Sequence, residues 1–281
     1  MKRTRALSIL SVLSLLLAMA ANLFTEGKPL DLIRSGEIAD TLLNLLLPAS
    51  LAFFIPLLVY AALAFYTGAA VRESFRKKDD RPIRWDAADG TLIVMNLLCH
   101  AAWVISLRLR LLPVSFALIL ILLATLLIME ERNFRRADQA FHGNRSRIRR
   151  GRRGARLVRF AIPIELYLGW ITVASVASAT VLLASFGAAN LFLGELSWTV
   201  VTIAATAILA LLMIANRGSI TFALVVAGSD CGIALERYRA ASPQALAVAA
   251  AAAAAAGLIL VVVTARLLVT LFTRFRERKT R

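Results

Sequence analysis

Long apolar stretches recur along the whole chain, and they constrain its fold more than any other feature. A helix needs about 20 mostly apolar residues to cross the hydrocarbon core of a bilayer. The eight stretches cover residues 6–23, 42–68, 91–107, 111–130, 160–185, 197–215, 219–235 and 245–272. They show little of the apolar–polar alternation of barrel strands, so helices satisfy the backbone in lipid. The sequence therefore predicts an all-α, polytopic bundle of about eight transmembrane helices in contact with membrane lipid.

Basic residues fall almost entirely on one side of this predicted bundle. The net charge of +16 would suggest nucleic-acid binding in a soluble protein, but 59% of the residues are hydrophobic. With eight spans, 26 of the 33 Lys and Arg residues lie on one side and 6 on the other, with Arg266 inside the last span. This is the positive-inside pattern of membrane proteins. It predicts both termini in the cytoplasm and no nucleic-acid partner.

The N-terminus has features of a secretory signal peptide, with basic residues followed by an apolar run. The run from Ala6 to Phe24 is long for the hydrophobic region of such a signal, so we expect an uncleaved first helix. The chain contains no phosphate-binding loop, dinucleotide fingerprint, zinc-protease motif or nucleophile–base pair, so we expect no enzyme. Cys99 and Cys231 lie within apolar stretches, which favours packing over a disulfide or a metal site.

The residues from Tyr167 to Ala174 read YLGWITVA. This motif resembles the fifth helix of the translocator-protein family, the tryptophan-rich sensory (TspO/MBR) proteins, and especially their longer bacterial forms. Residues 47–60, which begin LPAS, are similar to the family's second helix, and NLLCHAAW at 96–103 is similar to the third. Segments around Trp198 and residues 223–233 are similar to helices six and seven of the long forms. With four Trp residues, the chain lacks several of the family's aromatic residues.

The resemblance implies a division of the chain into two parts. Residues 1–188 would form a five-helix core with a basic cytoplasmic loop at 131–159, and residues 189–281 a three-helix membrane extension. The family further implies a bacterial cytoplasmic (inner) membrane and a hydrophobic small-molecule ligand in the bundle, such as a porphyrin or another haem-type tetrapyrrole. A second copy of the chain is a candidate partner.

Two predicted spans carry most of the candidate pocket. Tyr167 and Trp170 share a helix face with two small residues, a pattern that leaves a recess for a flat ligand but also suits ordinary packing. His100 could coordinate haem iron or bond to a ligand carboxylate, although a lone His in a span more often bonds to a neighbouring helix. Pro56 is expected to kink the second span. The predicted ligand-binding residues are Phe53, Tyr60, His100, Trp103, Tyr167, Trp170, Ala174 and Ser178.

Asp230 is an acid inside the seventh stretch, flanked two residues away on each side by glycines of a GxxxG pattern. An acid at membrane depth indicates a proton or ion site by default, and the pattern itself favours close helix contact. The alternative is a carboxyl group that is protonated or bonded to hydroxyls of the sixth stretch, at Thr199, Thr202 and Thr206.

Three classes of function follow from these observations. The first is binding of a hydrophobic ligand with a sensory or transport role. The second is ion- or proton-coupled transport that uses Asp230 and His100. The third is a non-catalytic scaffold whose basic segment at 131–159 recruits lipid or a partner, although the positive-inside pattern by itself accounts for that segment.

Overall fold

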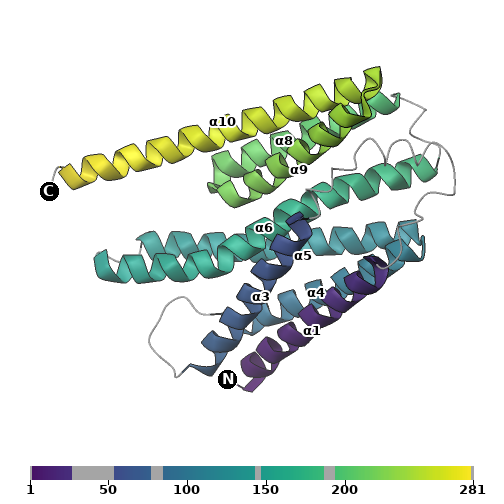
Figure 1. Cartoon of the computed structure of the whole chain (residues 1–281). Helices are drawn as coiled ribbons and strands as arrows, with labels where there is room; N and C mark the ends of the chain where they lie inside the picture. The colour runs from purple at the N-terminus through teal and green to yellow at the C-terminus, as the bar shows by residue number, and fades with distance from the viewer. Residues whose placement is uncertain (1, 27–53, 77–84, 143–146, 187–193, 280–281) are drawn as a thin grey trace.

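The computed structural model describes residues 2–26, 54–76, 85–142, 147–186 and 194–279. These residues form eight helices and no strand, which confirms the predicted all-α bundle (Figure 1). The helices are α1 (Lys2–Glu26), α3 (Phe54–Phe75), α4 (Ala87–Arg108), α5 (Leu112–His142), α6 (Arg147–Ser185), α8 (Glu195–Arg217), α9 (Ile220–Ala240) and α10 (Pro243–Lys279). Phe53 and the expected start of the second span lie outside the described residues.

Seven of these helices are long and apolar enough to cross a membrane. The exception is α9, which carries Asp230, Glu236, Arg237 and Arg239 within its 21 residues. Even so, α9 packs along α10, α6 and α8, so it belongs to the same bundle. The chain is therefore a multi-pass helical membrane protein.

The last three helices pack onto the first five through one continuous apolar core. Figure 1 shows α8, α9 and α10 together on one side of α6, with α1, α3, α4 and α5 on the other. Leu63, Leu97 and Ile171 from the first group share a single buried cluster with Val226 and Ile259 from the second. Burial of such side chains stabilises the contact through dispersion between closely packed atoms, because lipid gives helices little hydrophobic reason to associate.

The two groups approach each other closely at Gly169, within the YLGW motif. A Cβ atom at this position would lie 3.0 Å from the Cβ atom of Val225 and 3.1 Å from the backbone oxygen of Phe222 on α9. The GxxxG pattern gave a different expectation. A Cβ atom on Gly228 would meet only Ile55 of α3, at an ordinary 3.9 Å. The contact that lets α9 approach the core closely is thus made by a glycine of α6.

One detail of the helices differs from the sequence-based expectations, and a second lies at the edge of the described residues. Most of the segment 131–159 is helical, because α5 continues to His142 and α6 begins at Arg147. Arg and Glu favour the helical conformation as strongly as many apolar residues do. A run of charged residues therefore marks where the membrane-spanning part of a helix stops, while the helix itself continues. Pro56 is the third residue of the described part of α3, and the residues before Phe54 lie outside the described part of the chain. The kink at Pro56, which would free a carbonyl near residue 52, therefore stays a prediction.

Several helix ends that carry basic residues meet at one end of the bundle, here called the basic end. The start of α1 contacts the end of α3, where Arg5 donates to the backbone oxygen of Ser74 at 3.4 Å. The last turn of α8 reaches α5 through an ion pair between Arg217 and Glu131. The start of α1 also lies against the start of α4, because a Cβ atom on Gly90 would meet Leu7, and Asp89 beside it pairs with Arg132 of α5. The ends of α3, α5 and α8 therefore lie on the side where α1 begins.

A four-residue ion-pair network joins α4 to α5 at the basic end. Asp86 caps α4 by accepting hydrogen bonds from the backbone N–H groups of Ala88 and Asp89, at 2.9 and 3.0 Å. Arg132 contacts Asp86 at 2.8 Å and Asp89 at 2.9 Å, and Arg136 contacts Asp89 at 2.8 Å. Such a network holds the start of α4 against α5 more firmly than an isolated surface pair would.

Candidate functional site

His100 lies at the centre of a buried polar cluster in the first group of helices. Its side chain is 1% exposed. Nε2 lies 3.0 Å from the hydroxyl of Tyr60 on α3, and Nδ1 lies 2.7 Å from the hydroxyl of Tyr167 on α6. A neutral imidazole has one donor and one acceptor nitrogen, so both are used by the two tyrosines. Coordination of a haem iron would require one of these hydrogen bonds to break.

The hydrogen-bonded chain extends to α1 through Asn22. Its Nδ2 donates to the Tyr60 hydroxyl at 2.7 Å, so a chain Asn22–Tyr60–His100–Tyr167 links α1, α3, α4 and α6. Hydrogen bonds are strong where the surroundings are apolar, and a connected network specifies one arrangement of the helices. Sequence reasoning did not select Asn22. The available signal was an amide side chain near the end of an otherwise apolar stretch.

Two tryptophans pack around the imidazole. The Trp103 ring lies 5.6 Å from His100 and 5.9 Å from Trp170, and Trp170 lies 5.8 Å from His100. Trp170 also stacks on Tyr167 at 6.4 Å. The faces of α4 and α6 that were selected from helical spacing therefore meet. Trp103 is 7% exposed, and its indole nitrogen is buried without a hydrogen-bond acceptor.

The remaining predicted pocket residues are less closely tied to His100. Ala174 is half-buried and packs against the main apolar core one turn after Trp170, and Ser178 is half-buried one turn further. Asn96 lies on the same helix face as His100, but its side chain bonds to the neighbouring helix and not to the His100 cluster. Its Nδ2 donates to the backbone oxygen of Leu122 at 3.1 Å and to the hydroxyl of Thr125 at 2.7 Å, which joins α4 to α5.

Asp230 lies in a separate part of the bundle. Its side chain is 3% exposed, and its Oδ2 atom has no hydrogen-bond partner. Ile233, one turn further along α9, packs with Ile203 of α8 and Val248 of α10, which places this face of α9 inside the three-helix extension. The ring and hydrogen-bond contacts of His100 go to α3, α4 and α6. Asp230 and His100 therefore do not form one site by contact.

Two of the three hydroxyls expected to serve Asp230 donate to backbone oxygens of their own helix. Thr202 donates to the backbone oxygen of Trp198 at 2.8 Å, and Thr206 donates to the backbone oxygen of Ile203 at 2.9 Å. Across the described ranges, no three His, Cys, Asp or Glu side chains lie close enough together to hold a metal ion. Cys99 and Cys231 are free thiols.

The fold and the cluster define a multi-pass helical membrane protein with a Tyr–His–Trp centre enclosed by α3, α4 and α6. The chain belongs to the TSPO-like protein family, whose model matches residues 8–265. The match runs from α1 into α10, so it includes the three-helix extension, and it confirms the resemblance found in the sequence. No curated protein and no solved structure matches the chain.

Proposed function

We propose that the protein binds a flat, hydrophobic ligand with hydrogen-bond acceptors, such as a porphyrin, at the His100 cluster. The observation that carries this proposal is the indole N–H of Trp103, which is buried beside His100 without an acceptor. Buried polar groups without partners are rare in native proteins, and a ligand carboxylate or carbonyl would satisfy this one. Trp103 and Trp170 supply aromatic faces against which a planar ring system stacks.

In this proposal, His100 recognises the ligand by hydrogen bonding and is not an iron ligand. Both of its nitrogens are held by Tyr60 and Tyr167. A ligand acceptor can replace the tyrosine at the protonated nitrogen, so that one hydrogen bond is exchanged for another and the second tyrosine stays in place. The proposal is for a binding protein with a sensory or transport role, and not for an enzyme.

The test is a titration of the purified protein with protoporphyrin, followed by quenching of Trp fluorescence. Trp170→Phe and Trp103→Phe should each weaken binding, the latter by about tenfold because it removes a donor to the ligand. Trp198→Phe is the matched control, since its indole nitrogen is likewise buried without a partner but lies on α8, outside the His100 cluster. Wild-type protein without saturable quenching would rule the proposal out.

A second candidate function is proton or cation transport through Asp230. The observation in its favour is a nearly fully buried carboxyl group with one unpartnered oxygen. Such groups at membrane depth commonly lie on ion or proton pathways. In proteoliposomes, Asp230→Asn should abolish flux and leave porphyrin binding intact, because the two sites are separate. Equal flux in wild type and variant would exclude this role.

For topology, we infer that both termini lie in the cytoplasm of a bacterial cell, with the basic end at the inner face of the cytoplasmic membrane. The sorting of 26 of 33 Lys and Arg residues onto one side supports this orientation. Labelling of single cysteines introduced at Lys2 and Lys279 with a membrane-impermeant reagent tests it. Both positions should react only after the cells are opened.

A further inference from the structure

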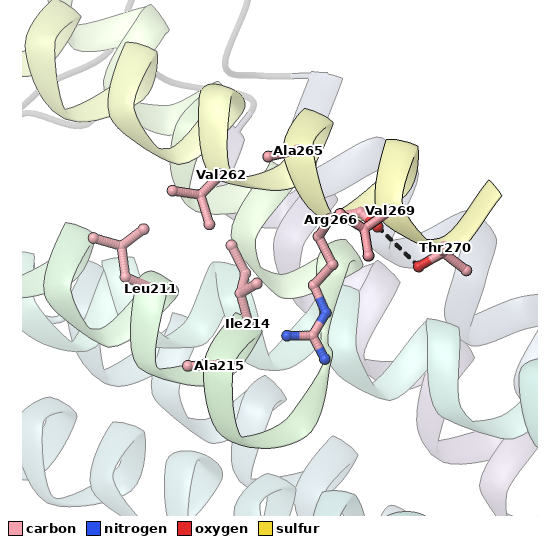
Figure 2. A pocket seen from close by; sticks show the side chains of 8 residues that line it. All are labelled: Leu211, Ile214, Ala215, Val262, Ala265, Arg266, Val269 and Thr270. Carbon is pink, nitrogen blue, oxygen red and sulfur yellow. Dashed lines mark hydrogen bonds between the residues drawn. The ribbon is translucent and has the colours of Figure 1, made fainter. Parts of the chain in front are cut away.

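A groove of about 670 Å³ runs between α8 and α10 near the basic end of the bundle. Figure 2 shows that its walls are aliphatic and that Arg266 reaches from α10 toward the last turn of α8. The residues that line it include Leu211 and Ile214 of α8 and Val262, Ala265, Arg266 and Val269 of α10. Ile214 is 2% exposed and forms the floor, whereas Val269 is 63% exposed at the rim. The groove is thus open to the surroundings of the bundle.

Arg266 has no ion-pair partner among the described residues, although it lies within an apolar helix. The contrast with Arg217, at the end of α8, is direct. Arg217 pairs with Glu131, and its guanidinium lies 4.5 Å from the centre of the Phe134 ring. The Arg266 guanidinium lies close to Gly218 at the end of α8, where an added Cβ atom would lie 3.3 Å from Nη2. Gly218 has a φ of 69°, which favours glycine and leaves the space that the guanidinium uses.

The Arg266 side chain is exposed, and its guanidinium favours a nearby anion. Arginine within a membrane span is costly unless it pairs or reaches the headgroup region. Arg266 lies beside the end of α8, which is the basic end, so it is at the depth where phosphates of one leaflet are found. The apolar walls at Val262 and Leu211 would be covered by a hydrocarbon chain. The groove therefore combines a cation with a slot for an aliphatic tail.

We propose that this groove is a binding site for an anionic phospholipid, with its phosphate on Arg266 and one acyl chain between α8 and α10. A free phosphate ion would leave the aliphatic walls uncovered. The residues that follow add further positive charge, since Arg274, Arg276, Arg278 and Lys279 come within the next four turns of the chain. Basic residues beside an anionic leaflet attract its headgroups.

A purely structural role for Arg266 makes a different prediction. The carboxyl end of a helix carries partial negative charge. In this alternative, Arg266 near Gly218 stabilises the end of α8 and has no other role. That role would require no lipid. It would also be insensitive to the headgroup and to the width of the groove.

The test compares lipid retention by native mass spectrometry of the full chain released from nanodiscs of phosphatidylglycerol or phosphatidylcholine. Wild type should retain phosphatidylglycerol preferentially, and Arg266→Gln should lower that retention about tenfold, the effect of one charge-assisted contact. Arg239→Gln is the matched control, since it removes the same charge from the opposite end of α9. It should leave retention unchanged.

Ala265→Phe separates the groove from the charge, because it fills the slot and keeps Arg266. It should lower retention of phosphatidylglycerol as well. Glycerol phosphate in excess should not displace the lipid from wild type. Displacement would show a phosphate site without an acyl slot, and retention unaffected by both Arg266→Gln and Ala265→Phe would show that Arg266 serves only α8. Either result would overturn the proposal.

Discussion

The hydroxyl of Tyr167 lies 2.7 Å from Nδ1 of His100, and both side chains are almost completely buried. Tyr167→Phe removes this bond and leaves a buried ring nitrogen unpaired. We expect the free energy of unfolding to fall by about 1–3 kcal/mol, the cost of an unsatisfied buried polar group. Thermal unfolding in a fixed detergent measures the change. Tyr238→Phe, at a residue that is 70% exposed, is the control and should have no effect.

Tyr60→Phe should be less harmful than Tyr167→Phe, because Tyr60 is half-buried whereas Tyr167 is completely buried. It should nevertheless loosen α1, since Asn22 loses its acceptor on α3. Hydrogen exchange of α1 measures this loosening. A larger loss of stability in Tyr60→Phe than in Tyr167→Phe would show that the hydrogen bond from Tyr60, and not that from Tyr167, fixes the position of His100.

The contrast between Trp170 and Asn22 shows what the sequence could and could not predict. A period of 3.6 residues places Trp170 and Tyr167 on one helix face, so their shared surface could be derived from spacing alone. The contact of Asn22 with Tyr60 depends on which helix packs beside α3. In lipid, most helix surfaces are apolar, so hydropathy does not rank the neighbours. The close contact of Gly169 with α9 could not be predicted for the same reason, because the small size of this residue matters only where α9 packs against it.

Gly169→Ala should weaken the attachment of α9 to α6. The added Cβ would lie 3.1 Å from the backbone oxygen of Phe222, which cannot move without shifting the helix. We expect a loss of about 1–3 kcal/mol of stability, typical of overpacking. Gly68→Ala is the matched control, since no atom lies within 4 Å of its Cβ position, and it should gain about 0.5–1 kcal/mol from lower backbone entropy of the unfolded chain. A destabilised Gly68→Ala with an unchanged Gly169→Ala would contradict the packing argument.

Acid should weaken the junction between α4 and α5 through Asp86. Burial tends to raise the pKa of this carboxyl group, but the backbone N–H of Asp89 and the guanidinium groups of Arg132 and Arg136 together lower it. Because the folded pKa is below the unfolded value, the stabilisation is complete above the unfolded pKa of about 3.9 and is lost as the pH falls through the folded pKa. Thermal midpoints at neutral pH and at successive values below about pH 4 measure the loss.

Asp86→Asn isolates the charge from the cap, because Asn caps helices as well as Asp does. The variant should be less stable than wild type at neutral pH and should lose less stability on acidification. High salt should reduce the difference between the two proteins, since Asp86 is partly exposed. An equal acid response in both proteins would assign the effect to other carboxyl groups.

Asp230→Asn should leave the protein as stable as wild type or make it more stable. The carboxyl group is 3% exposed and its Oδ2 has no partner, so the folded state bears a solvation cost that a neutral amide of the same shape reduces. The expected gain is up to about 1–3 kcal/mol in thermal unfolding. Ser229→Ala is the control, because the Ser229 hydroxyl only bonds to the backbone oxygen of Val225 in its own helix. A loss of more than about 1 kcal/mol in Asp230→Asn would mean that the carboxylate has a bound counter-ion, which would favour the transport role over passive burial.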